Sequence, residues 1–218
     1  MKTFSATANG SSTIGWAYYG SSSWSTGSTN GARQGSYHAS SSSKSRVGVM
    51  VFSGAGAALK GKSIKKITFT ITTSKAGYNR SKTISFRKAN YQYLNTGVNG
   101  SAQAGASLGG LSGTFYGTTL TFTLNSTSNT ALFNNLAAYF KAGNSALSIY
   151  NGETSTSSTY SSNYLCINSC AMTVEYETGA VYYYKDGAWK RCSAYYWTNG
   201  QWVKCLPYYR ENSEWKKG

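Results

Sequence analysis

The chain has 218 residues, a net charge of +15 and an aromatic share of 15%. All six carboxylates lie from Glu153 onward, so residues 1–152 cannot by themselves supply the paired acids of a glycosidase, the acid of a Ser-His-Asp triad, or a carboxylate site for calcium or magnesium. Disordered chains lack apolar surface of this extent, so we expect a folded protein. Because the catalytic and metal-binding carboxylates are missing from most of the chain, we expect a binding or structural protein that is not an enzyme.

The first part of the chain contains few regular signals. The N-terminus lacks the apolar stretch of a secretory signal, and no apolar run is long enough to span a membrane. Gly, Ser and Thr dominate residues 1–45, and the aromatic residues spaced among them predict packed loops around short strands near 3–8 and 13–18. From residue 46 onward, apolar residues of β-branched and aromatic type predict further strands. These strands span residues 46–52, 64–73, 83–87, 119–124, 146–150 and 164–176.

Two of these strands show how the core should be arranged. In residues 64–73 the apolar side chains of Ile67, Phe69 and Ile71 share one face, and Lys and Thr occupy the other, which is typical of a half-buried strand. Residues 164–176 carry apolar side chains on both faces, as expected of a strand in the centre of a sandwich.

One segment breaks the strand period. Apolar residues recur at helical spacing over 132–140, which predicts one short helix over residues 129–141. Ser128 or Asn129 can cap the start of this helix, and Gly143 stands where a left-handed residue would end it.

The four cysteines lie in the last 53 residues of the chain. Cys166 and Cys170 lack zinc-finger spacing and, on one strand at ~3.3 Å per residue, are too far apart for a mutual disulfide. We expect buried thiols in a protein made in a reducing cytosol, and neither a metal nor another cofactor. Cys192 and Cys205 occupy equivalent positions of a repeat, so their pairing stays open.

The overall pattern predicts two domains. About eight strands with one helix across an end predict an all-β fold, a jelly-roll β-sandwich, over residues 1–177. A 13-residue period predicts a module of aromatic β-hairpin repeats over residues 178–218. The motif Tyr-Tyr-x-x-Asp/Asn-Gly-x-Trp occurs twice there, followed by a looser third copy in which Asn-Ser replaces the turn pair.

The turn pairs predict the register of each hairpin. Asp-Gly and Asn-Gly are strong signals for two-residue type I′ turns, which need positive φ at both positions. The predicted cross-strand pairs are Tyr184 with Trp189, Trp197 with Trp202, Arg210 with Trp215, and Glu211 with Glu214. The poorer turn and the two opposed glutamates predict that the third hairpin is the weakest.

Two interpretations compete for these aromatic residues. Their rings can form the core of the small module, or they can form a stacking platform for sugar rings or for a partner protein. The candidate binding residues are Tyr183, Trp189, Tyr196, Trp202, Tyr209 and Trp215.

Both predicted domains resemble parts of known phage proteins. Residues 46–52, 62–71 and 171–176 together resemble a jelly-roll module found in tail-tip, fibre and other minor structural proteins of bacteriophages, and in some carbohydrate-binding modules. The aromatic units resemble repeats that end many tail proteins of phages infecting Gram-positive bacteria. They are distantly similar to choline-binding repeats, but their period is shorter, and choline binding is not carried over.

This resemblance implies a non-enzymatic virion protein of the tail tip, fibre or capsid decoration, assembled in the cytoplasm of the host bacterium. It implies partners among other virion proteins, a homo-oligomer such as a trimer, and binding to a host cell-wall polysaccharide. A carbohydrate-binding module outside a phage is the alternative that the same resemblance leaves open.

The excess positive charge belongs to the predicted sandwich, whose first 152 residues hold 14 bases and no acid. The basic surface candidates are Lys60, Lys62, Lys65, Lys66, Arg87 and Lys88. They suit teichoic acid, another anionic wall polymer or an acidic neighbour in the particle. The alternative is nucleic-acid binding, with Tyr78 and Tyr91 stacking on bases, but these cations resemble solvated strand edges. His38, the single histidine, is expected to be an ordinary side chain and not a catalytic one.

Overall fold

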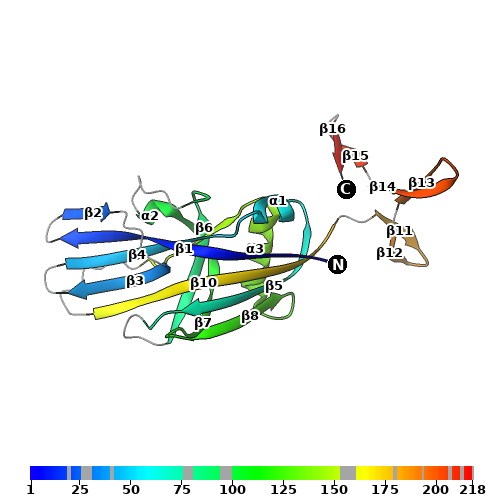
Figure 1. The fold of residues 1–218 in the computed structure, drawn as a ribbon. Helices are drawn as coiled ribbons and strands as arrows, with labels where there is room; N and C mark the ends of the chain where they lie inside the picture. The colour runs from blue at the N-terminus through cyan, green and yellow to red at the C-terminus, as the bar shows by residue number, and fades with distance from the viewer. Residues whose placement is uncertain are drawn as a thin grey trace. The chain divides into compact units, whose positions relative to one another are not determined.

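A computed structural model gives the fold (Figure 1). It divides into two compact units, Thr3–Tyr176 and a unit that joins Met1–Lys2 to Glu177–Gly218. The structure describes residues 1–18, 21–25, 31–39, 42–75, 81–93, 100–152, 161–178, 181–192, 194–205, 208–211 and 214–217, with side chains in only part of these ranges.

The larger unit is an antiparallel sheet of ten strands that curves back on itself (Figure 1). The main hydrogen-bonded order is β2-β1-β10-β3-β4-β9-β6-β7; β5 joins β10 to β8, and β1 also pairs with β4. The strands are β1 Lys2–Tyr18, β2 Ser21–Ser25, β3 Ala32–Ala39, β4 Ser42–Val51, β5 Ser63–Thr73, β6 Ser81–Ala89, β7 Ala104–Thr114, β8 Thr119–Asn125, β9 Ala146–Ile149 and β10 Ser161–Glu177. The all-β prediction is confirmed.

β5 confirms the predicted alternation and shows its cause. Ile67, Phe69 and Ile71 are fully buried, whereas the threonines between them are half-buried on the opposite face. There Thr70 and Thr72 meet the hydroxyls of Thr121 and Thr119 on β8, at 3.2 and 3.0 Å. The hydrophobic side of the strand therefore faces the core, and the outer side is linked by cross-strand hydroxyl contacts.

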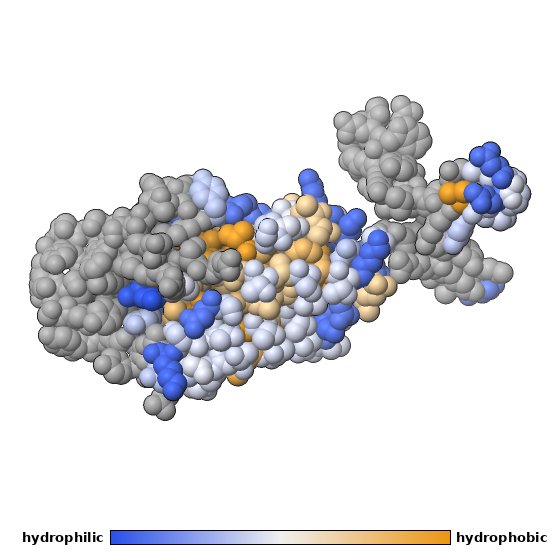
Figure 2. All heavy atoms as spheres, viewed as in Figure 1, coloured by the Kyte–Doolittle hydropathy of each residue, from blue (hydrophilic) through white to orange (hydrophobic). Residues whose placement is uncertain are grey.

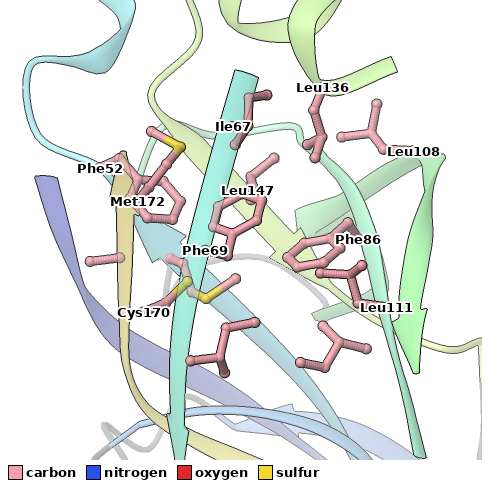
Figure 3. Close-up of a cluster of buried hydrophobic side chains, with 14 of the residues drawn as sticks. Phe52, Ile67, Phe69, Phe86, Leu108, Leu111, Leu136, Leu147, Cys170 and Met172 are labelled. Carbon is pink, nitrogen blue, oxygen red and sulfur yellow. The ribbon is translucent and has the colours of Figure 1, made fainter. Parts of the chain in front are cut away.

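Aromatic rings fill the centre of the core (Figure 3). Phe69 stacks on Phe86 of β6 with ring centroids 5.5 Å apart and an interplanar angle of 16°. Phe52 lies 6.0 Å from Phe69, and it meets Phe140 edge to face at 6.3 Å and 82°. Rings from β5, β6, the helix and the segment after β4 thus meet in one cluster, whose members include residues far apart in the sequence.

The predicted helix is confirmed as α3, Thr130–Lys141, and Gly143 after it has a φ of 95°, as expected. Its N-cap is Asn129, at a φ of 52°, but the predicted side-chain cap is absent. The Asn129 amide instead donates to the carbonyl of Thr123 at 3.3 Å. The structure also contains two short helices that were not predicted, α1 Ala55–Leu59 and α2 Gly100–Gln103.

Several strand predictions were incomplete. β2, β3 and β7 were not predicted, and the two expected N-terminal strands are one continuous strand, β1. β7 is rich in Gly and Ser, and only Leu108 and Leu111 among its residues are buried. A side chain at Gly110 would place its Cβ 2.6 Å from Thr83, so close pairing with β6 requires glycine there.

Cys166 and Cys170 are both buried, as predicted. Desolvation by burial raises the pKa of Cys170 to about 12. The side chains of Cys192 and Cys205 lie outside the described residues.

The smaller unit contains three separate two-stranded sheets, one for each predicted hairpin. Their strands are β11 Val181–Lys185 and β12 Ala188–Cys192, β13 Ala194–Thr198 and β14 Gln201–Cys205, and β15 Tyr208–Glu211 and β16 Glu214–Lys217. Every predicted cross-strand pair is confirmed. Asp186 and Asn199 have φ of 55° and 48°, and the glycine after each has 76°, as type I′ turns require. The third turn lies outside the described residues.

The aromatic stack gives a stability prediction. We expect Phe69→Ala to lower the free energy of unfolding by ~3–5 kcal/mol, because it removes a fully buried ring and leaves a cavity. Denaturant unfolding followed by far-UV circular dichroism measures this loss. Thr68→Ala, on the opposite face of β5, is the matched control and should change stability by less than ~0.5 kcal/mol. Equal losses in the two variants would contradict the assigned orientation of the strand.

Cys170 gives a pH prediction. Its raised pKa means that the native state keeps a proton that the unfolded state releases, so this contribution to stability is complete below about pH 9 and is lost as the pH rises toward 12. At pH 8 the native protein should therefore leave Cys170 unmodified by iodoacetamide, whereas the denatured protein should be alkylated there. Peptide mapping by mass spectrometry measures the modification, and rapid native alkylation of Cys170 would contradict its burial.

Candidate functional site

The second hairpin is the part of the aromatic module whose side chains are best described. Trp197 lies opposite Trp202, and Tyr195 lies opposite Lys204. Because side chains alternate between the faces of a strand, Tyr195, Trp197 and Trp202 share one face. Tyr196, opposite Val203, belongs to the other face.

The three aromatic residues on the shared face are strongly exposed. The exposed fractions are 53% for Tyr195, 58% for Trp197 and 67% for Trp202. The two indole rings meet edge to face, with centroids 5.2 Å apart and an interplanar angle of 67°. This geometry stabilises the pair and leaves large ring surfaces in contact with solvent. For this hairpin, the exposure favours a binding platform over a buried core.

The register also divides the predicted set of binding residues. Trp202 lies on the exposed face, and Tyr195 and Trp197, which share it, were missing from the prediction. The register position of Tyr196 belongs to the alternate set, and its side chain lies outside the described residues. The turn signal could have found them, because a two-residue turn fixes the register and the register fixes the faces.

In the other two hairpins, backbone pairing likewise assigns alternate residues to two faces. Trp189 pairs with Tyr184 and Trp215 pairs with Arg210, whereas Tyr183 and Tyr209 pair with lysines at the alternate positions. The side chains of these four predicted residues lie outside the described part of the chain. The predicted Arg210–Trp215 cation–π contact lies outside it too.

The predicted basic surface contains cations of two kinds. Lys66 forms an ion pair with Glu175 of β10. Arg87 donates from Nε to the carbonyl of Tyr150 at 2.9 Å and from Nη1 to the carbonyl of Gly105 at 3.2 Å. Both therefore have interactions within the fold. Lys60, Lys65 and Lys88 are exposed, and Lys62 is half-buried. Figure 2 shows hydrophilic residues dispersed over the visible face.

Two further arginines contact an aromatic ring. The guanidinium carbon of Arg46 lies 4.7 Å from the centroid of the Tyr164 ring, and that of Arg33 lies 6.0 Å from it. Arg46 is only 7% exposed. A cation held over a ring face is stabilised by the ring quadrupole, so these contacts help the fold to accommodate buried positive charge.

A second aromatic pair lies after β6. The rings of Tyr91 and Tyr93 are 6.1 Å apart, and Tyr93 is 58% exposed. Between them, the Gln92 side-chain oxygen accepts from the backbone N–H of Ser145 at 2.7 Å and of Ala146 at 3.0 Å. Hydrogen bonds therefore anchor the segment that presents this pair.

Other kinds of site find no support in the described residues. No group of three or more His, Cys, Asp or Glu side chains that could hold a metal ion occurs among them. The helices of this described part include none with the length and hydropathy needed to cross a membrane. The side chains of His38 and Tyr78 lie outside the described residues.

The turn of the second hairpin yields a prediction. Gly200 has a φ of 76°, where a Cβ costs ~1–2 kcal/mol. Because an isolated hairpin is marginal in water, we expect Gly200→Ala to open it and separate Trp197 from Trp202. The loss of the indole exciton couplet in far-UV circular dichroism measures this change. Asn199→Gly, which keeps the turn type accessible, is the control; an intact couplet in Gly200→Ala would contradict the assigned turn.

Comparison with protein-family models, curated protein sequences and solved structures gives no match for this chain. The functional argument therefore depends on the residues of the chain itself. Among the described side chains, the exposed face formed by Tyr195, Trp197 and Trp202 is the strongest candidate for a binding surface.

Proposed function

We propose that the chain is a non-enzymatic structural protein of a bacteriophage particle, and that its aromatic hairpins bind a glycan on the surface of the host cell. The exposed face of Tyr195, Trp197 and Trp202 is the single observation that carries this proposal. Sugar rings present C–H groups on their faces and hydroxyls at their edges. Amphipathic Trp and Tyr rings match both, because each has an apolar face and a polar tip.

The larger unit is consistent with a jelly-roll β-sandwich, which we propose as its finer architecture. β1 pairs with β4 through residues 9–18, and its neighbours in the main strand order are β2 and β10. Long strands that change partners in this way are compatible with the two layers of a jelly roll. By resemblance, such a unit serves as the assembly domain of a tail tip, fibre or capsid decoration, forms a homo-oligomer such as a trimer, and is assembled in the host cytoplasm.

Nucleic-acid binding is the weaker hypothesis. Two of its proposed cations, Lys66 and Arg87, have interactions with Glu175 and with backbone carbonyls of the fold. Using either cation to bind phosphate would weaken these contacts.

Retention of the full chain on purified cell walls from a panel of Gram-positive bacteria tests the proposal. We expect the wild type to sediment with walls of its host group. We expect Trp202→Ala to lower the association constant by about 10-fold, because it removes one stacking surface worth ~1–1.5 kcal/mol.

Tyr93→Ala is the matched control, because it removes an exposed aromatic ring from the larger unit. It should bind walls as the wild type does. Circular dichroism establishes that both variants are folded. The proposal fails if no wall preparation retains the wild type, or if folded Trp202→Ala binds as tightly as the wild type.

A further inference from the structure

The register of the hairpins defines a surface that we call the tryptophan face. In the second hairpin it contains the positions of Tyr195, Trp197, Trp202 and Lys204. Tyr195 pairs with Lys204, and Trp197 pairs with Trp202, so the four positions form two alternate rungs of the ladder, separated by the Tyr196–Val203 rung, and belong to one side. The register position of a lysine thus belongs to the same face as the exposed indoles, two residues along the strand from Trp202.

The same four register positions recur in the other two hairpins. Cross-strand pairing assigns Tyr182, Tyr184, Trp189 and Arg191 to the tryptophan face of the first hairpin. It assigns Tyr208, Arg210, Trp215 and Lys217 to that of the third. Every unit therefore has Tyr at the first position, Trp at the third and a cation at the fourth. The second position is Tyr, Trp or Arg, all of which can stack on a flat ring.

The opposite face of the hairpins is less regular: it repeats a tyrosine position, Tyr183, Tyr196 and Tyr209, but the residue paired with it is lysine in the first and third units and valine in the second. Its positions include Lys185 and Lys190 in the first unit but Thr198 and Gln201 in the second. In the third unit the pair Glu211 and Glu214 belongs to it. No carboxylate occurs on the tryptophan face of any unit, whereas two occur on the opposite face of the third. Only the tryptophan face combines an aromatic pair or ring with a cation in all three units, because the opposite face has no cation in the second unit.

This pairing of ring and cation indicates the charge of the ligand. An indole face attracts a sugar ring whatever its charge, but a cation repeated beside it favours a ligand that places an anion near each stacked ring. A ligand that meets three such units must itself repeat. We propose that each tryptophan face binds one segment of an anionic polysaccharide, with a sugar ring on the tryptophan and a phosphate or carboxylate beside the cation.

This inference rests on the proposed function and specifies its ligand. Three linked units bind one polymer by avidity, since the second and third contacts are intramolecular once the first has formed. The contribution of each cation depends on salt, because binding to a polyanion releases counterions. The opposite face should contribute little to the affinity, even where it also carries lysine.

A matched pair of triple variants of the full chain tests the proposal. Arg191→Gln, Lys204→Gln and Lys217→Gln together remove three positive charges from the tryptophan faces. Lys185→Gln, Lys190→Gln and Lys216→Gln together remove three from the opposite faces, so the net charge falls equally. The probes are immobilised wall teichoic acid, which carries phosphate, teichuronic acid, which carries carboxylate, and a neutral peptidoglycan preparation stripped of both.

We expect the wild type to bind at least one of the two anionic polymers more tightly than the neutral wall at ~50 mM salt, with an affinity that falls steeply by ~200 mM. The tryptophan-face triple should lose about 30-fold or more in affinity for that polymer and show a smaller salt slope. The opposite-face triple should stay within about 3-fold of the wild type. The polymer that is bound identifies phosphate or carboxylate as the anion. Retention of the indole exciton couplet shows that the second hairpin remains folded, and an unchanged far-UV circular dichroism spectrum is the control for the other two.

The other outcomes overturn the inference in distinguishable ways. Equal losses in the two triples would indicate unspecific attraction to net charge, and no loss in either would show that the cations do not contribute to binding. Binding to neutral wall alone would preserve the proposed function and reject the anionic ligand. Failure to bind any of the three probes would reject both.

Discussion

The first 152 residues contain no carboxylate side chain, so any ion pair of their cations needs an acid from a later segment. In the larger unit, the strand β10 supplies one such acid. β10 pairs with β1, β3 and β5, so it connects parts of the sheet that are distant in sequence. It also supplies groups that neighbouring cations need: Glu175 for Lys66, and the ring of Tyr164 for Arg46. A strand that completes the sheet therefore also compensates part of the charge of the segment that precedes it.

Aromatic rings have different functions in the two units. In the larger unit, Phe52, Phe69 and Phe86 meet in a buried cluster, where the removal of their surfaces from water stabilises the fold. In the second hairpin, Trp197 and Trp202 contact each other but keep more than half of their surfaces exposed. The first arrangement uses aromatic surface for stability, and the second leaves it available for a ligand.

Sequence patterns predicted the features that depend on local chemistry. The alternation around Phe69 located β5 and its buried face, and the Asn-Gly turn fixed the register around Trp197. β7 was missed because few of its residues are apolar; its conformation is determined by pairing with β6, including the close approach at Gly110. A pattern along one strand contains no information about such a partner.

The candidate site was predicted only in part for a related reason. The prediction took the second Tyr of each Tyr-Tyr pair, Tyr196 among them, whereas alternation along the strand places the first one, Tyr195, on the face of Trp202. The absent side-chain cap at Asn129 is a similar case. The residue has the right position, but its amide finds a partner in the carbonyl of Thr123. Competing contacts of this kind cannot be read from the identity of the residue alone.

The long reach of β10 also orders events during synthesis. Ser5 and Thr173 contact each other across 168 positions, so the start of β1, which precedes its pairing with β4 at residues 9–18, lacks this partner until β10 has left the ribosome. Until then, the acid-free segment that precedes β10 lacks the groups that β10 supplies to its cations, such as Glu175 for Lys66. The hairpins, whose turns join Lys185 to Ala188 and Thr198 to Gln201, need only their own residues to close. Each of these hairpins can therefore close as soon as its own residues have been synthesised.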